Sequence, residues 1–380
     1  MDNKLRIQWF IEQNQNWEEV LREKPYCLNI TRDQMFGRNL IMFKYNQIES
    51  DFMNPLVREC RGLILDEDTL EKISIPFFKF GNAGEPYCPE IDWKHCWVGG
   101  KIDGSLVKVV RLGDRLLIST NGTIDAFKAT LAEQLGCRAK SFGELFVEAL
   151  KTDNLMTDTF LGLLEEGKTY MFELTSPYNK VVVSWPETRL YFLGVRDNET
   201  LQETYFLDHR LGCMFKTPEV FPLRSLDECV KAASVLDCNE EGYVVCDKNF
   251  NRVKVKSPLY VSLHHMANNH VMTHERGLEI VRKNELDEVG IYFPEFKEGL
   301  EKINTDYHNL IKTIKESQMR FLENSKACES RKDYAMLIQK EFGKFSGVGF
   351  ALLDKKVNTV EEWMEKATTL NLCKYLGYKD

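Results

Sequence analysis

The segment Lys101-Ile102-Asp103-Gly104-Ser105-Leu106 combines a primary amine, a carboxylate and a flexible turn within six positions. Its flanks, residues 97–100 and 106–110, read as strands, so we expect the lysine at a turn where backbone can approach a ligand closely. A neutral, well-aimed lysine there can attack a phosphorus atom. The same string also suits an ordinary hairpin, because Asp-Gly is a common turn pair. In isolation, the string favours the turn-only interpretation.

Two further acids stand beside apolar runs. Glu173 lies inside Met171-Phe172-Glu173-Leu174, and a buried carboxylate must be paired or functional because burying a bare charge is costly. Glu241 lies in Glu240-Glu241-Gly242-Tyr243, before another strand. Carboxylate oxygens suit Mg²⁺, which keeps several waters and takes few protein ligands. The alternatives are a strand whose acid faces water and a simple acidic turn.

The run Arg252-Val253-Lys254-Val255-Lys256-Ser257 alternates strictly between cations and valines. In a strand, this alternation places Lys254 and Lys256 on one face. Two ammonium groups on one face repel each other, and an anion between them would relieve the repulsion, which makes a phosphate site attractive. The alternative is a solvated edge strand, where lysines are common.

Two other cations have a suggestive setting. Arg61, in Glu59-Cys60-Arg61-Gly62, precedes a strand, where a fixed arginine can grip a phosphate or pair with a carboxylate. The alternative is an exposed salt-bridging turn. Lys79 stands among three aromatic residues in Pro76-Phe77-Phe78-Lys79-Phe80-Gly81-Asn82. This suits either a half-buried strand with a snorkelling lysine or a cation near a nucleotide in an apolar cleft.

Four histidines, His264, His265, His270 and His274, cluster further along the chain. No flanking cysteine or glutamate pair has standard metal spacing, so we do not expect these histidines to bind zinc.

Composition bounds the class of protein. The 380 residues are 43% hydrophobic and 28% charged, enough for a large globular domain plus a smaller one. No apolar stretch approaches the length of a membrane span, and no secretory signal is evident. Eleven irregularly spaced cysteines without a Cys-x-x-Cys pair predict reduced thiols in a cytoplasmic protein. The net charge of −8 argues mildly against a nucleic-acid-coated protein but allows a local basic groove.

The chain reads as mixed strand and helix first, and as helices later. Apolar runs at residues 40–43, 63–65, 116–118, 181–183 and 191–193 predict strands. Ser141 and Ser225 each precede a glutamate by three positions and predict helix starts. Amphipathic patterns at residues 294–321, 334–342 and 360–370 predict helices, the last started by Thr359. We place a domain boundary near residues 264–275.

In order, these segments resemble the covalent nucleotidyltransferase superfamily of ATP-dependent RNA and DNA ligases and mRNA capping enzymes. Lys-x-Asp-Gly-Ser matches its nucleophile motif, and later motifs match in the correct order. These are Phe172-Glu173, Glu241-Gly242-Tyr243 and Lys254-Val255-Lys256. The closer resemblance is to the RNA ligase 1 family, typified by the phage T4 enzyme. It rests on residues 59–62, Glu241-Gly242-Tyr243-Val244, Tyr45-Asn46, Lys256-Ser257-x-x-Tyr260-Val261-Ser262-Leu263-His264 and, more weakly, Lys332-x-Tyr334-Ala335-Met336.

The resemblance implies an α+β fold. A nucleotidyltransferase domain of antiparallel sheets with flanking helices would span residues 1–265, followed by an all-α domain, residues 266–380, as a candidate for RNA substrate recognition. Capping enzymes and DNA ligases usually continue into an oligonucleotide-binding β-barrel instead. The phage enzyme has Lys-Gly where this chain has Asn121-Gly122, so a cation near the nucleotide is missing. Either another lysine substitutes for it, or the contact with the nucleotide differs.

The resemblance also implies a chemistry. Lys101 would attack the α-phosphorus of ATP to form lysyl-AMP, AMP would move to an RNA 5′-phosphate, and a 3′-hydroxyl would displace AMP. A lysine ordinarily titrates near ~10.4, so nearby positive charge must lower its pKa. By analogy, Lys101, Asp103, Lys254 and Lys256 are catalytic. The ATP contacts are Tyr45, Arg61, Lys79, Lys101, Glu173, Glu241, Lys254 and Lys256, and Asp103, Glu173 and Glu241 serve Mg²⁺ or Mn²⁺ mainly through water.

The expected substrate is RNA with 5′-phosphate and 3′-hydroxyl ends, with nicked tRNA as one candidate. We expect a monomer with no membrane contact, and an end-healing kinase or phosphatase could work in the same pathway. Three alternatives stay open: a capping-type enzyme that takes GTP, a DNA-ligase-type enzyme, and a non-catalytic RNA-binding relative that has kept the pocket.

Overall fold

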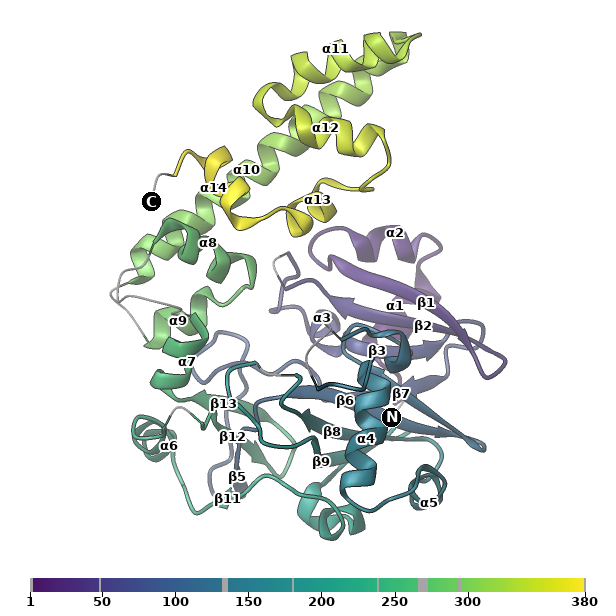
Figure 1. The fold of residues 1–380 in the computed structure, drawn as a ribbon, viewed down its shortest axis with the longest axis vertical. Coiled ribbons are helices and arrows are strands. Elements are labelled where there is room, and N and C mark those ends of the chain that lie inside the picture. Colours follow the sequence, from purple (N-terminus) through teal and green to yellow (C-terminus); the bar gives the residue numbers. More distant parts are fainter. Residues whose placement is uncertain are drawn as a thin grey trace. The chain divides into compact units, whose positions relative to one another are not determined.

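The computed structural model describes residues 3–47, 49–131, 136–179, 181–237, 239–265, 273–292 and 296–378. The chain forms two compact units, Met1–His264 and His265–Asp380 (Figure 1). Within the described residues, no helix has both the length and the apolar character needed to cross a membrane. The cysteines in these ranges carry free thiols.

The first unit contains three sheets, and all their strand pairs are antiparallel. The first sheet, in spatial order, is β1 (Leu28–Met35), β2 (Arg38–Tyr45), β3 (Arg61–Asp66) and β4 (Lys72–Ser74). The second is β10 (Glu203–Tyr205), β9 (Arg189–Asp197), β8 (Lys168–Thr175), β6 (Ser105–Leu112) and β7 (Arg115–Thr120). The third is β11 (Val220–Phe221), β5 (Cys96–Gly100), β12 (Gly242–Asp247) and β13 (Arg252–Lys256).

The second sheet is buried on both faces because its strands alternate between two apolar clusters. Val107 and Val109 of β6 pack with Phe172 of β8 and with α4 (Phe142–Thr152), which lies across this sheet (Figure 1). Val110 points the other way, into a cluster with Met42 of the first sheet. The two sheets are therefore joined by a shared apolar layer.

The remaining helices of the first unit are short: α1 (Arg6–Gln13), α2 (Trp17–Arg22), α3 (Pro55–Glu59), α5 (Thr157–Leu163), α6 (Leu226–Ala233) and α7 (Pro258–His265). Both helix starts predicted from serine are confirmed. Ser141 accepts a hydrogen bond from the N–H of Glu144, and Ser225 from that of Glu228. Each glutamate side chain accepts from the residue before the serine, so each side chain satisfies one further amide.

The second unit is helical, as predicted, which together with the antiparallel sheets confirms the α+β fold class. Its helices are α8 (His274–Arg282), α9 (Leu286–Tyr292), α10 (Lys297–Asn324), α11 (Arg331–Phe342), α12 (Ser346–Leu353), α13 (Val360–Lys366) and α14 (Thr369–Leu376). Apolar residues of α10 form its buried face, among them Leu300, Ile303 and Tyr307.

Two predicted elements are wrong in detail. The single helix expected at residues 360–370 is two helices, α13 and α14. Thr368 between them is extended and accepts a hydrogen bond from the N–H of Asn371, which starts a new helix. The strand expected at residues 181–183 is an irregular loop, because the amides of Val182 and Val183 bind a carboxylate instead of a neighbouring strand.

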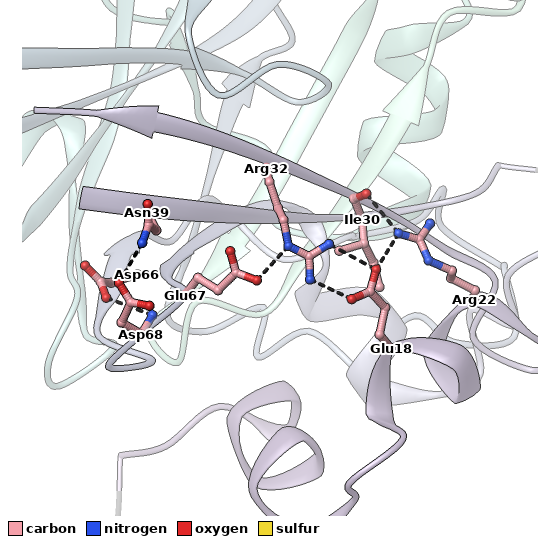
Figure 2. Close-up of polar contacts among 8 residues, drawn as sticks. All are labelled: Glu18, Arg22, Ile30, Arg32, Asn39, Asp66, Glu67 and Asp68. Atoms are coloured by element: carbon pink, nitrogen blue, oxygen red, sulfur yellow. Dashed lines mark hydrogen bonds and ion pairs between the residues drawn. The ribbon is translucent and has the colours of Figure 1, made fainter. Parts of the chain in front are cut away.

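A network of charges joins α2 to the first sheet (Figure 2). Arg32 of β1 donates two hydrogen bonds to Glu18 of α2 and one to Glu67, which follows β3. Arg22 also donates to Glu18. The hydrogen bonds from Arg32 outweigh desolvation and lower the pKa of Glu18 to about 2. We call these four residues the surface network.

Candidate active site

A cavity of about 370 Å³ lies among the three sheets of the first unit. Arg61 of β3, Glu173 of β8 and Lys254 of β13 line it, so every sheet contributes a wall. The cavity brings together all eight residues predicted as ATP contacts: Tyr45, Arg61, Lys79, Lys101, Glu173, Glu241, Lys254 and Lys256.

Lys101 lies on the connector between β5 and β6, which belong to different sheets. The hairpin interpretation of this segment is therefore wrong. The backbone N–H of Lys101 donates to the carbonyl of Gly242 at 2.7 Å, and its Nζ lies 2.7 Å from Oε2 of Glu241. The Lys101 side chain is thus held at the junction of two sheets.

Glu241 is almost fully buried and bridges two ammonium groups. Its Oε2 faces Lys101, and its Oε1 lies 3.4 Å from Nζ of Lys256. Gly242 has φ +136°, and a Cβ there would come within 2.2 Å of the carbonyl oxygen of Val255. Because the backbone tolerates only glycine at this point, β12 can approach β13 closely and bring the glutamate to both lysines.

Glu173 lies at the cavity wall, not on the outer surface. Burial raises the pKa of its carboxyl to about 7, since desolvation outweighs the nearby charge of Lys101, which lowers the pKa. The charge of Glu241 raises it further. A carboxyl held near its titration point is typical of functional sites.

The alternating run on β13 delivers its two lysines to the cavity as predicted from its period. Lys254 and Lys256 both line the cavity. The alternative, a solvated edge strand, is wrong because residues 81–83 cover the edge: the N–H of Lys254 donates to Gly81, and that of Ala83 donates to the Lys254 carbonyl. Lys256 also stands 5.4 Å from the ring centre of Tyr260.

In the segment at residues 59–62, Arg61 and Glu59 face different parts of the structure. Arg61 lines the cavity, with its guanidinium 5.3 Å from the ring centre of Phe80. Glu59 is buried and faces α1, where it accepts hydrogen bonds from the side chain and the N–H of Arg6. The negative charge at the helix N-terminus ties α1 to the strand that carries Arg61.

Lys79 stands between aromatic rings, not on a strand. Its Nζ lies 4.4 Å from the ring centre of Phe52 and 5.3 Å from that of Tyr45. Its backbone N–H donates to the carbonyl of Arg58. Cation–π contacts of this kind hold an ammonium group at a fixed place in an apolar wall.

Asp103 is the predicted site residue that the structure sets apart, because it does not line the cavity. One carboxylate oxygen accepts the N–H groups of Val182 and Val183, and the other accepts the hydroxyl of Tyr260 at 2.8 Å. Trp185 donates to its backbone carbonyl. These contacts fix the Asp103 carboxylate in place, and its metal role stays a prediction.

Sequence reasoning missed several lining residues. Arg252 lines the cavity and stands two positions before Lys254 in the same alternation, so the sequence carries a signal for it. Glu203 fixes it from β10, sharing its carboxylate with Arg196. Several other missed residues form an apolar part of the wall, among them Phe77, Phe80, Trp97, Leu106, Leu193 and Phe206.

Two further predictions concern Asn121 and the histidines. Asn121, which stands where the phage enzyme has a lysine, lines the cavity, and its Oδ1 is buried with no hydrogen-bond partner in the described ranges. Of the histidines, His274 stacks on Tyr378 with ring centres 4.4 Å apart. His270 and the side chains of His264 and His265 lie outside the residues that the structure describes.

The sequence profile of the RNA ligase family matches residues 59–260, more than half of the chain. The chain belongs to the RNA ligase family. The resemblance drawn from the motifs is thereby confirmed, and so is the enzyme class at the level of the family. The matched region holds every predicted site residue except Tyr45.

Several relatives are similar over different shares of their length. The RNA ligase of Rhodothermus phage RM378 is 25% identical over 387 residues, covering 82% of this chain and 84% of the relative. RNA ligase 1 of bacteriophage TS2126 is 27% identical over 227 residues, 56% and 53% of the two chains. A protein of Autographa californica nuclear polyhedrosis virus, provisionally named a bifunctional polynucleotide kinase/RNA ligase, is 33% identical over 242 residues. That match covers 60% of this chain and one third of the viral protein.

Among solved structures, an archaeal ATP-dependent RNA ligase aligns with a TM-score of 0.46 and 11% identity, over 90% of this chain and 91% of the archaeal one.

Proposed function

We propose that this protein is an ATP-dependent RNA ligase that joins 5′-phosphate and 3′-hydroxyl RNA ends. One observation carries the proposal: Lys101 lines a cavity that also holds Arg61, Lys79, Arg252, Lys254 and Lys256. A cavity lined by six cationic side chains and two acidic ones, Glu173 and Glu241, suits a triphosphate, whose charge has to be neutralised during transfer.

The first step forms lysyl-AMP. The Nζ lone pair of Lys101 attacks the α-phosphorus, a P–N bond forms, and the P–O bond to pyrophosphate breaks. The amine must first lose a proton, and Oε2 of Glu241, at 2.7 Å, is placed to receive it. Lys254 and Lys256 hold the α-phosphate, while Arg61 serves the leaving pyrophosphate.

Tyr45 and Lys79 complete the triphosphate end of the site, and Glu173 accepts a ribose hydroxyl. Asp103 acts by holding the loop at residues 182–185 and Tyr260 behind the connector that carries Lys101. This is a different role from the metal contact that its motif suggested.

Two later steps complete the ligation. An oxygen of the RNA 5′-phosphate attacks the adenylate phosphorus, and the lysine leaves with its electron pair. The 3′-hydroxyl then attacks the activated 5′-phosphate, loses its proton, and expels AMP. The same cations neutralise the phosphate charge in each step, so a single cavity serves all three.

Divalent metal is the expected cofactor, Mg²⁺ or Mn²⁺. The cavity fits such an ion because Glu173 and Glu241 present carboxylate oxygens to it, and hard cations prefer oxygen ligands. Among the described residues, no cluster of three or more acidic, histidine or cysteine side chains is placed to bind a metal ion. Besides the two glutamates, the ligands of the ion would therefore be water and phosphate oxygens. When bound, the ion supplies further positive charge at the phosphates.

The biological setting follows from this chemistry. Substrates would be broken RNAs, nicked tRNA among them, with ends prepared by a kinase or phosphatase in a cytoplasmic repair pathway. The first unit acts as the adenylyltransferase, and the helical unit selects RNA. We propose that the protein works as a monomer.

Labelling with radioactive ATP and Mg²⁺ tests the function. The wild type should retain a covalent label that survives denaturation, and Lys101→Ala should lose it. Lys128→Ala, which removes a surface lysine paired with Asp33, is the matched control. Label that persists in Lys101→Ala, or label from GTP alone, would refute the proposal. A labelled protein that seals nicked DNA but no RNA would refute the RNA assignment.

A further inference from the structure

Lys108 is a lysine in the apolar interior of the second sheet. It is fully buried on β6, where alternation places it on the same face as Leu106 and Val110. Both of those neighbours belong to apolar clusters. A buried ammonium group is costly, so a lysine kept at such a position calls for a compensating role.

The contacts of Lys108 lead to the cavity wall. Its Nζ donates to the carbonyl of Gly62. A Cβ built on Gly62 would lie 2.8 Å from Nζ of Lys108 and 2.7 Å from the carbonyl oxygen of Asn121. The ammonium group therefore sits directly behind Arg61 and Asn121, both of which line the cavity.

The charges around Lys108 are mainly of its own sign. Burial lowers the pKa of Lys108 to about 7, and the charge of Arg61 on β3 lowers it further. On β2, Nζ of Lys44 lies 3.5 Å from where a Cβ would stand on Gly122, beside Asn121. No carboxylate among the described residues acts on Lys108; Glu173 of β8 interacts instead with Lys101 and Glu241.

We propose that Lys108 is a positioning residue that places a buried positive charge behind Arg61 and Asn121 and so strengthens the binding of the phosphates that leave as pyrophosphate. An anion in the cavity relieves the repulsion between Lys108 and Arg61, because a charge of opposite sign then faces both. In the protein interior such an attraction is weakly screened. Lys108 thus supplies a positive charge behind the uncharged Asn121. The inference rests on the proposed function.

The test removes the charge while keeping the shape. Lys108→Met should raise the KM for ATP in the labelling reaction roughly five- to thirtyfold, with a smaller effect on kcat. Its melting temperature should not fall, since an apolar side chain replaces a charge without an acidic partner. Adding Asn121→Lys to Lys108→Met should return the KM towards the wild-type value, because a cation is then present just after the end of the neighbouring strand β7.

A pH series separates charge from packing. The KM of the wild type should rise more between pH 6.5 and 8.5 than that of Lys108→Met, because Lys108 loses its proton only in the wild type, whereas Glu173 ionises in both. Lys168→Met, which removes a lysine of β8 that pairs with Glu165, is the matched control and should behave as the wild type. An unchanged KM in Lys108→Met, or no recovery in the double variant, would overturn the inference, whereas loss of label from the wild type would instead refute the proposed function.

If Lys108→Met does not fold, the wild type still decides the matter. AMP, measured as an inhibitor, has the same ribose and α-phosphate as ATP. Ionisation of Glu173 should therefore change the affinities for AMP and ATP alike. Only ATP carries the phosphates that Lys108 acts on. The ratio of ATP to AMP affinity should therefore fall severalfold from pH 6.5 to 8.5, and a constant ratio would reject the proposal.

Discussion

The surface network and the cavity use the same residue types under opposite conditions. In the surface network, Arg32 is raised in pKa and Glu18 is lowered to about 2, because the two hydrogen-bond to each other in partial contact with water. At the cavity wall, burial raises the pKa of Glu173 to about 7, and directly behind that wall burial lowers the pKa of Lys108 to about 7. Each shift outside favours the charged form, and each shift inside favours the neutral form.

This contrast separates charges that stabilise the fold from charges that the fold tolerates. In an exposed ion pair, each charge is satisfied by its partner and by water, and the pair contributes little to the stability of the fold. A buried group without sufficient partners costs stability, and the cost is recovered when a charged ligand binds. Substitutions in the two regions should therefore have opposite consequences.

The largest expected effect is on catalysis, from Glu241→Gln. This change leaves Lys101 and Lys256 beside each other without the carboxylate that bridges them. We expect the rate of covalent labelling to fall on the order of 100-fold, the usual cost of removing one preorganised electrostatic partner. Rates of AMP–protein formation at saturating ATP provide the measurement.

The same substitution in the surface network is the control for Glu241. Glu67→Gln removes one acceptor of Arg32 but leaves the cavity intact. Its labelling rate should equal that of the wild type. Equal losses in both variants would mean that the cavity has no special electrostatic role.

Asp103→Asn should act on stability first. Its carboxylate accepts three hydrogen bonds, and an amide nitrogen cannot accept the one it replaces, so we expect a loss of about 2 kcal/mol in the free energy of unfolding. The Mg²⁺ concentration for half-maximal labelling should not change. Asp125→Asn, at the half-buried cap of the short helix Ala126–Lys128, is the control. A tenfold rise in that Mg²⁺ concentration with unchanged stability would make Asp103 a metal ligand after all.

The smallest effects are opposite slopes of stability against pH. The pKa of Glu173 is raised from 4.5 to about 7 on folding, so its stabilising contribution is present below pH 4.5 and is lost as the pH rises through 7. Glu173→Gln should therefore stabilise the protein at pH 8, by about 1 kcal/mol. The pKa of Glu18 is lowered to about 2, so its contribution is present above pH 4.5 and is lost as the pH falls through 2.

Glu18→Gln should accordingly destabilise the protein at pH 7, by only about 0.5 kcal/mol because the pair is exposed. Urea unfolding of both variants from pH 3 to 8 measures the two slopes. Slopes of the same sign would show that burial does not distinguish the regions.

The local parts of the site could be predicted from the sequence. Lys101, Glu241 and the pair Lys254 and Lys256 are each carried by a short string with its own period or turn, and the cavity collects them all. The strings could not indicate which way each side chain points or which distant residue it contacts. Asp103 stands two residues from Lys101, yet its carboxylate faces Tyr260, 157 positions away along the chain.

The misses have the same physical cause. Residues 181–183 have the composition of a strand, but the amides of Val182 and Val183 are taken by Asp103, a partner that no local pattern reveals. Glu59 lies in a motif with Arg61 but binds α1, 53 positions away. Lys108 did carry a signal, since a lysine between Leu106 and Val110 breaks an apolar face of β6, although its meaning depended on Gly62 in another sheet.

The connector that carries Lys101 is anchored at both ends to different sheets. Its first residue binds Gly242 of the third sheet, and Gly104 at its other end leaves no room for a Cβ against the carbonyl of Leu174 in the second. The position of the Lys101 side-chain nitrogen therefore depends on the spacing between the second and third sheets. Heat or denaturant that loosens either sheet would displace this nitrogen before the sheets separate. The labelling activity should therefore be lost at a lower temperature or denaturant concentration than the one at which the protein unfolds.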